Sequence, residues 1–94
     1  MLIAMICFDK PNHVEVRMKA RPEHLAWLQA SGVPIMSAGP ILQDDGETPM
    51  GTLLIGDFES LAAARALHKQ DPYVKAGLFE RVIIQPTRKV LPAA

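Results

Sequence analysis

The 94-residue sequence has almost no cysteine and no excess of charge of either sign. Its single cysteine, Cys7, rules out an intrachain disulfide framework and a cysteine-rich zinc site. Cys7 also lies in an apolar run without a basic neighbour that could activate its thiol, so we expect it to be buried and unreactive. Ten Lys and Arg residues balance ten Asp and Glu residues, whereas a protein that binds nucleic acid usually has a basic excess or a basic stripe. The sequence therefore predicts no nucleic-acid partner.

Long hydrophobic runs and cofactor motifs are missing as well. No apolar stretch approaches the roughly 20 residues that a transmembrane helix needs. The start, Met1-Leu2-Ile3, has neither the basic segment nor the cleavage site of a signal peptide. No phosphate-binding glycine loop, calcium loop or spaced set of metal ligands is present. We therefore expect a soluble, cytoplasmic protein that does not bind membranes and has no metal or cofactor.

The composition is that of one ordinary globular domain. Hydrophobic residues make up 49% and charged residues 21% of the chain, which is typical of folded proteins. A chain of this length has room for a single core. We predict one domain over residues 1–94, in which the mixed tail of about 88–94 is loose.

The pattern of apolar and turn residues predicts four strands and two main helices. The run Leu2–Phe8 is apolar throughout, which predicts a strand buried on both faces. Between residues 14 and 31 the apolar residues share one helical stripe, which we expect to face the core. Pro22 within it predicts either a kink or two shorter helices. The stripe consists of Val14, Met18, Leu25 and Leu28; further strands are expected at 34–42, 51–58 and 78–86, a helix at 61–70 and a short helical turn at 72–76.

This order of elements, β-α-β-β-α-β, predicts a ferredoxin-like α+β fold with an antiparallel sheet. Right-handed crossovers would place both helices on one face of that sheet. The strands are nevertheless apolar on both faces, as the runs Leu53–Ile55 and Val82–Ile84 indicate. Something must bury the second face, and the simplest partner is another copy of the chain. We therefore expect a homodimer that packs face to face.

Three chemically active side chains share one face of the first predicted helix. Arg17, Arg21 and His24 lie at i, i+4 and i+7, within about 60° of one another on an ideal helix. Two guanidinium groups and an imidazole could bind an anion and transfer a proton. The alternative is an ordinary solvated helix face, because arginine is normally exposed. Spacing alone leaves both interpretations open.

The sequence Asp71-Pro72-Tyr73 also has two interpretations. Asp71 has the position of an N-cap, followed by a proline at the first helical residue. Alternatively, a carboxylate at this chain reversal could reach a histidine on the first helix, fix its tautomer and stabilise its charged form. The residues by themselves do not choose between the two.

Several motifs together resemble one known family. They are Arg17 with Arg21-Pro22-Glu23-His24-Leu25, then Ala38-Gly39-Pro40, Gly51-Thr52-Leu53-Leu54-Ile55, and the run from Asp71-Pro72-Tyr73 to Gly77-Leu78-Phe79. In this order and spacing they resemble the YciI-like (YCII-related domain) family, and the resemblance covers the chain from Leu2 to about Lys89. The family is similar to dimeric α+β barrel proteins, so the resemblance implies that assembly here too.

The resemblance also implies an active site built on a His–Asp pair, which would be His24 and Asp71. It implies a small cofactor-free enzyme, with dehydrochlorination of chlorinated hydroxylated rings as the activity linked to the family. We expect His24 to act as a general acid–base oriented by Asp71, and Arg17, Arg21 and Tyr73 to bind a small-molecule substrate.

The expected reaction is an elimination or an isomerisation of a small polar aromatic or oxoacid. Two other classes of function stay open. One is a non-catalytic ligand-binding or regulatory module, because ferredoxin-like folds have many functions. The other is a cofactor-free monooxygenase of the dimeric-barrel kind, which would need a deep, largely apolar pocket.

Overall fold

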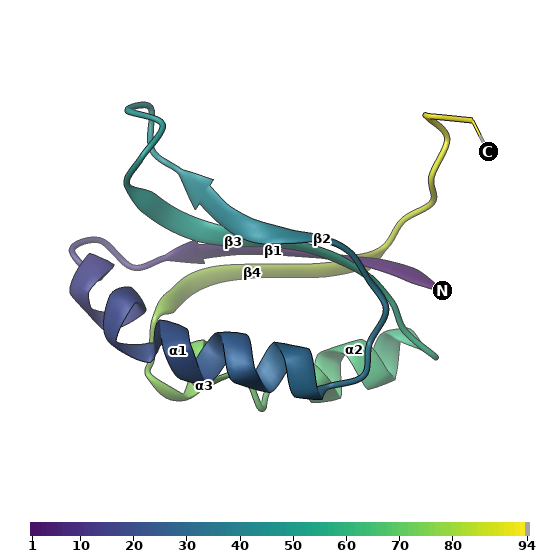
Figure 1. Cartoon of the computed structure of the whole chain (residues 1–94), viewed down its shortest axis with the longest axis horizontal. Helices are drawn as coiled ribbons and strands as arrows, with labels where there is room; N and C mark the ends of the chain where they lie inside the picture. Colours follow the sequence, from purple (N-terminus) through teal and green to yellow (C-terminus); the bar gives the residue numbers. More distant parts are fainter. Residues whose placement is uncertain (94) are drawn as a thin grey trace.

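Four antiparallel strands form one sheet, and all helices lie on one side of it (Figure 1). The computed structural model describes residues 1–93. The strands are β1 (Leu2–Asp9), β2 (Ile35–Leu42), β3 (Pro49–Asp57) and β4 (Phe79–Pro86), arranged β2-β3-β1-β4. The helices are α1 (Val14–Ala30), α2 (Leu61–His68) and α3 (Pro72–Lys75). The predicted ferredoxin-like α+β fold is confirmed; residue 94, the end of the predicted loose tail, lies outside the described residues.

The helix α1 is continuous, although it contains Pro22. The predicted alternative of two shorter helices is therefore wrong. Pro22 is exposed, so water can hydrate the carbonyl that loses its helical partner. The helix ends at Ala30 with Ser31 as its C-cap, and Gly32 follows with a φ of 74°, the left-handed conformation that glycine adopts readily. No helix within residues 1–93 has the length and apolar character needed to cross a membrane.

The hydrophobic core lies between the sheet and the helices. It consists of Ile3, Met5, Leu54, Phe58, Ala64 and Ile84. The predicted buried stripe of α1 is partly wrong: Met18 is 51% and Leu25 is 40% exposed. The residues that α1 buries are instead Arg17 and His24. The apolar periodicity located the helix but not its buried face, because Met18 and Leu25 border a cleft rather than the core.

Cys7 belongs to the row of β1 side chains that face the helices, and it is buried. Burial raises the pKa of its thiol to about 12, with a further contribution from the charge of Asp71 and an opposing one from Arg17. The thiol is therefore protonated at neutral pH, and Cys7 is a small packing residue rather than a nucleophile.

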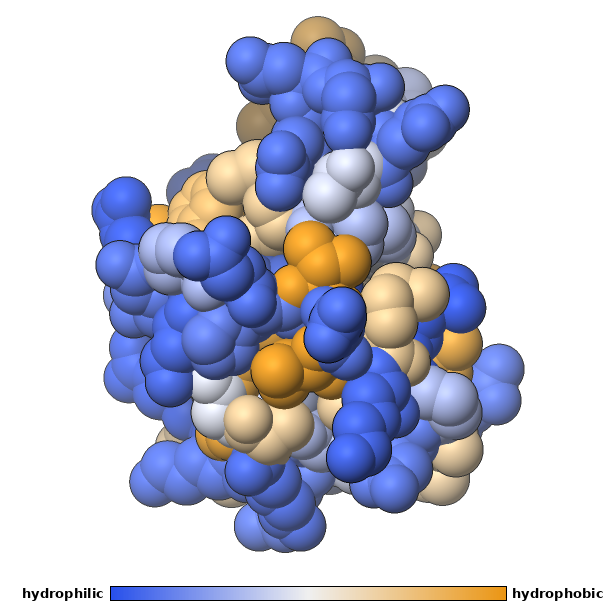
Figure 2. Space-filling view, turned by 90° about the vertical axis from the view of Figure 1, so that its left-hand side faces the viewer, coloured by the Kyte–Doolittle hydropathy of each residue, from blue (hydrophilic) through white to orange (hydrophobic). Residues whose placement is uncertain are grey.

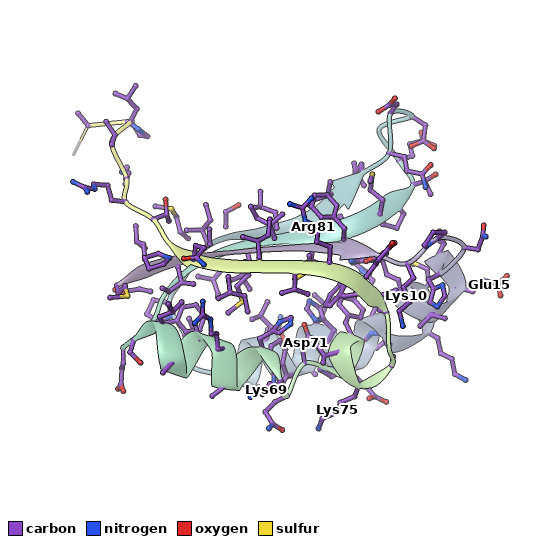
Figure 3. All side chains as sticks on the ribbon, turned by 180° about the vertical axis from the view of Figure 1, so that it is seen from behind. Lys10, Glu15, Lys69, Asp71, Lys75 and Arg81 are labelled. Carbon is purple, nitrogen blue, oxygen red and sulfur yellow. The ribbon has the colours of Figure 1, made fainter. Side chains whose placement is uncertain are left out.

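The opposite face of the sheet has no helix over it, and the tip of the β2–β3 hairpin and the C-terminal tail both rise on that side (Figure 1). Apolar side chains occupy its centre. Ile6 pairs across the strands with Leu53 and with Ile83, and Leu53 is 38% exposed. Arg81 lies on the same side, near the edge (Figure 3). Within the described chain this face has an apolar row without a covering layer.

Candidate functional site

A cleft of about 350 Å³ separates α1 from the β2–β3 hairpin. Most of its walls are apolar, and a few polar side chains reach into it, which is the usual character of a small-molecule site. At the end of the molecule where the hairpin rises, apolar side chains are exposed between polar ones (Figure 2). The lining residues are Arg17, Met18, Arg21, His24, Leu25, Leu28, Ala38, Gly39, Pro40, Leu42, Glu47, Pro49, Thr52, Leu54 and Tyr73.

His24 and Asp71 meet at the inner side of this cleft. Nδ1 of His24 lies 2.8 Å from Oδ1 of Asp71, and the two residues are only 7% and 5% exposed. A carboxylate can only accept, so Nδ1 carries the proton of this hydrogen bond. Asp71 lies between the sheet and the helices, whereas Lys69 and Lys75 point away from the sheet (Figure 3). The predicted contact across 47 residues of sequence is present.

Asp71 is at the same time the N-cap of α3. Its Oδ1 also accepts a hydrogen bond from the backbone nitrogen of Tyr73, at 2.9 Å. Asp71 is therefore both an N-cap and the partner of a histidine on α1, so the contacts of both interpretations from the sequence are present. Because the cap fixes the carboxylate relative to the backbone of α3, the position of the His24 ring is fixed relative to that backbone as well.

His24 lines the cleft, and the ring nitrogen that Asp71 leaves free is Nε2. It has no hydrogen-bond partner among residues 1–93. No fully buried side-chain nitrogen or oxygen in that range is unpaired, so Nε2 is accessible to solvent. The described residues also contain no group of three His, Cys, Asp or Glu side chains that could hold a metal ion. His24 thus presents an unprotonated nitrogen to the cleft when its ring is neutral.

The ring of Tyr73 lies between His24 and Arg17. It stacks on the imidazole with centroids 4.0 Å apart and planes inclined by 14°. The guanidinium carbon of Arg17 is 4.6 Å from the Tyr73 ring centroid. His24 occupies one face of the ring, so Arg17 lies over the other, in the geometry of a cation–π contact. Burial raises the pKa of Tyr73, although the charges of Arg17 and Arg21 oppose that shift.

Arg17 is held by residues of the sheet. Nε and Nη2 donate to the Asp9 carboxylate at 2.7 and 2.9 Å, and Nη2 also donates to Oγ1 of Thr52 at 2.7 Å. Burial alone would lower the pKa of Arg17, but the hydrogen bonds and charge of Asp9 outweigh it and the pKa is raised. The sequence analysis assigned neither Asp9 nor Thr52 to the site. The one available signal was a threonine within the apolar stretch of the third strand.

Arg21 has a different environment from its two neighbours on α1. It is exposed and lines the cleft, with no hydrogen-bond or ion-pair partner among residues 1–93. Of the three residues, only Arg21 is solvent-exposed, as the alternative of a solvated helix face predicted. Arg17 and His24 are buried. The structure brings together all five residues that the sequence proposed for the site, with Asp71 behind His24 and the other four lining the cleft. Their chemical roles stay predictions.

Fold and site together define a small ferredoxin-like α+β protein in which a carboxylate holds a histidine at the side of a cleft. The chain belongs to the YCII-related domain family, which matches residues 1–88. It is 39% identical to the protein YciI of Escherichia coli over 97 residues, with 96% of this chain and 99% of the relative covered. It is also 39% identical to an uncharacterised Haemophilus influenzae protein over 89 residues, with coverage of 87% and 91%.

Solved structures share this fold. A 5-chloro-2-hydroxyhydroquinone dehydrochlorinase from Burkholderia phenoliruptrix AC1100, in complex with 2,5-dihydroxybenzoquinone, has a TM-score of 0.85, with 30% identity and 94% of both chains covered. An antibiotic biosynthesis monooxygenase has a TM-score of 0.57 with 11% identity, covering 95% of this chain and all of the other. The second likeness concerns the fold alone.

The buried ion pair of Arg17 and Asp9 predicts a large stability effect. Asp9→Asn leaves the buried guanidinium without its counter-charge, and we expect the free energy of unfolding to fall by about 3 kcal/mol. The matched control is Asp57→Asn, because Asp57 pairs with the N-terminal amine at the surface and exposed pairs contribute only about 0–1 kcal/mol. Urea unfolding of both variants measures the difference. Equal losses would contradict a structural role for the buried pair.

Proposed function

We propose that the protein is a cofactor-free enzyme that uses His24 and Asp71 for general acid–base chemistry on a small polar aromatic or oxoacid substrate. The reaction would be an elimination, such as dehydrochlorination, or an isomerisation. One observation carries this proposal: the buried hydrogen bond of 2.8 Å occupies Nδ1 of His24 and leaves Nε2 for the cleft. A base that is held in position by a second group is well suited to catalytic proton transfer.

In the proposed reaction Nε2 of His24 accepts a proton from the bound substrate. Asp71 stabilises the imidazolium that forms, because its carboxylate lies against the protonated Nδ1. In an elimination of hydrogen chloride, the proton goes to Nε2 and the electron pair of its broken bond forms a new π bond in the substrate. Chloride leaves with the electron pair of the broken carbon–chlorine bond. General-base catalysis of this kind contributes typically about 10²- to 10⁴-fold in rate.

The proposed substrate-binding residues divide the remaining tasks. Arg21 is the cation with no partner in the described chain, so it would bind a phenolate, enolate or carboxylate of the substrate. Arg17 contributes positive charge from the inner end of the cleft, while two of its nitrogens stay with Asp9 and Thr52. Tyr73 holds the imidazole by stacking and offers an edge of its ring to the ligand.

The comparisons favour this class of reaction over the two alternatives. The dehydrochlorinase with a TM-score of 0.85 contains a hydroxylated ring as its ligand, and the apolar walls of the cleft here suit a ring of that size. The monooxygenase shares the fold at 11% identity, which supports no common chemistry. A purely structural histidine would not need access to a cleft, so that access favours a role of His24 toward a ligand.

Chloride release from 5-chloro-2-hydroxyhydroquinone and related chlorinated hydroxylated rings tests the proposal. We expect His24→Ala to lower the rate at least about 100-fold, because the base is lost, with fold and assembly preserved. His13→Ala is the matched control, since the Nδ1 of His13 lies 2.8 Å from the carbonyl of Pro11 and the residue does not line the cleft. Asp71→Asn keeps a good N-cap but removes the charge, so its rate should fall while its stability changes little. Unchanged rates in both site variants would exclude the His–Asp mechanism.

We also propose that the chain forms a homodimer through the uncovered face of the sheet, as a dimeric α+β barrel. The support is the apolar row around Ile6, which pairs with Leu53 and Ile83 on the neighbouring strands. Monomeric proteins rarely expose a large contiguous apolar patch. A second copy would cover this face and complete the missing layer.

Ile6→Asp tests this assembly. A charge in the middle of the interface should lower both the dimer fraction and the stability, because an obligate interface of above about 2,000 Å² depends on its apolar centre. Ala26→Asp, which adds the same charge at an exposed position of α1, should stay dimeric. Sedimentation velocity at micromolar concentration is the measurement. A wild-type chain that sediments as a folded monomer would overturn the proposal.

A further inference from the structure

Two charged groups of the cleft lack a counter-charge in the described chain. Arg17 forms an ion pair with Asp9, but Arg21 on α1 and Glu47 on the β2–β3 loop form no ion pair among residues 1–93. Both line the cleft, one from each of its two walls. The cleft therefore has a cation on the helix side and an anion on the hairpin side, with apolar side chains between them.

The position of Glu47 is set by the loop that carries it. Oδ1 of Asp45 accepts from the backbone nitrogens of Glu47 and Thr48, each at 2.9 Å, and Oδ2 accepts from the hydroxyl of Thr48. The backbone nitrogen of Gln43 donates to the carbonyl of Thr48 at 2.8 Å, which closes the loop. These bonds hold the backbone of Glu47 in one place at the hairpin wall, and from there its exposed side chain lines the cleft.

We propose that Glu47 is a specificity-determining residue, which together with Arg21 restricts the ligands of the cleft to monoanions that carry a hydrogen-bond donor at the end opposite the anionic group. This inference depends on the proposed function only in placing the ligand in this cleft. It does not require that His24 be catalytic. Glu47 extends the set of site residues to the hairpin, where the sequence indicated only a polar turn.

The physical reason is the low polarity of the walls. Glu47 and Arg21 are themselves exposed, but a ligand bound against the apolar walls is partly shielded from water, where charges interact more strongly. A second anionic group near Glu47 is therefore repelled. A hydroxyl at that end is favoured instead, because the carboxylate accepts its hydrogen bond. Selection of this kind works through repulsion of the wrong ligand as much as through attraction of the right one.

Three rigid rings of similar size test the proposal: 4-hydroxybenzoate, which has one anionic group and one donor, terephthalate with two anionic groups, and hydroquinone with two donors. Dissociation constants at pH 7 come from NMR titration of the intact protein. We expect 4-hydroxybenzoate to bind roughly tenfold or more tightly than terephthalate. Hydroquinone should also bind more weakly than 4-hydroxybenzoate, because it offers no anion to Arg21.

Two variants test the contributions of the two walls of the cleft separately. Glu47→Gln should reduce the preference over terephthalate at least roughly fivefold by improving terephthalate binding, and Arg21→Gln should remove the preference over hydroquinone. Asp44→Asn is the matched control, because it removes one negative charge from the same loop at a residue that does not line the cleft, and it should leave the preference unchanged.

Each other outcome contradicts the proposal. Equal effects of Glu47→Gln and Asp44→Asn would show that only the overall charge of the loop matters, and a cleft that binds none of the three rings has no such selectivity. His24→Ala distinguishes this inference from the proposed function, because it should abolish turnover and keep the preference among the three rings. If the wild-type cleft is selective but the protein has no turnover, the proposed enzyme is overturned and the role of Glu47 is kept.

Discussion

Oδ1 of Asp71 accepts two hydrogen bonds, one from the backbone of Tyr73 and one from the ring of His24. The first begins α3 and turns Tyr73 toward α1, and the second fixes the imidazole against that same short helix. Stacking of Tyr73 on His24, with Arg17 on the far side of the ring, follows from this placement. One carboxylate oxygen thus joins α1 to α3 through two residues that are 47 positions apart in the sequence.

The site is built into the layer where a small protein would normally place only apolar side chains. Arg17, His24, Thr52 and Asp71 are all buried between the sheet and the helices. Buried polar groups of this kind add little net stability, since their desolvation offsets most of their attraction. They fix positions instead, because each has a hydrogen-bond partner within the site. The cost is a smaller hydrophobic core, which makes a covering layer on the open face of the sheet more important.

Local pattern was sufficient to predict the elements, because runs such as Leu2–Phe8 and caps such as Asp71 depend on neighbouring residues. The contact of His24 with Asp71 was suggested by motifs, since no local rule relates residues on different helices. The burial of Met18 and Leu25 was wrongly predicted, because periodicity identifies an apolar side but not a cleft beside it. Asp9 and Thr52 were missed because their contact with Arg17 depends on the register of β1 and β3, where Cys7 and Thr52 are cross-strand partners.

The central claim is that Asp71 keeps the proton of neutral His24 on Nδ1, so that Nε2 is the basic nitrogen of the cleft. Nitrogen-15 NMR of the imidazole rings tests it without any substrate, with the His24 signals assigned by their loss in His24→Ala. The account predicts a protonated Nδ1 and an unprotonated Nε2 for His24 above the pH at which the ring loses its charge, and a loss of this tautomer preference in Asp71→Ala. A neutral His24 with its proton on Nε2 would contradict the account, because such a ring could neither donate to Asp71 nor accept a proton from the cleft.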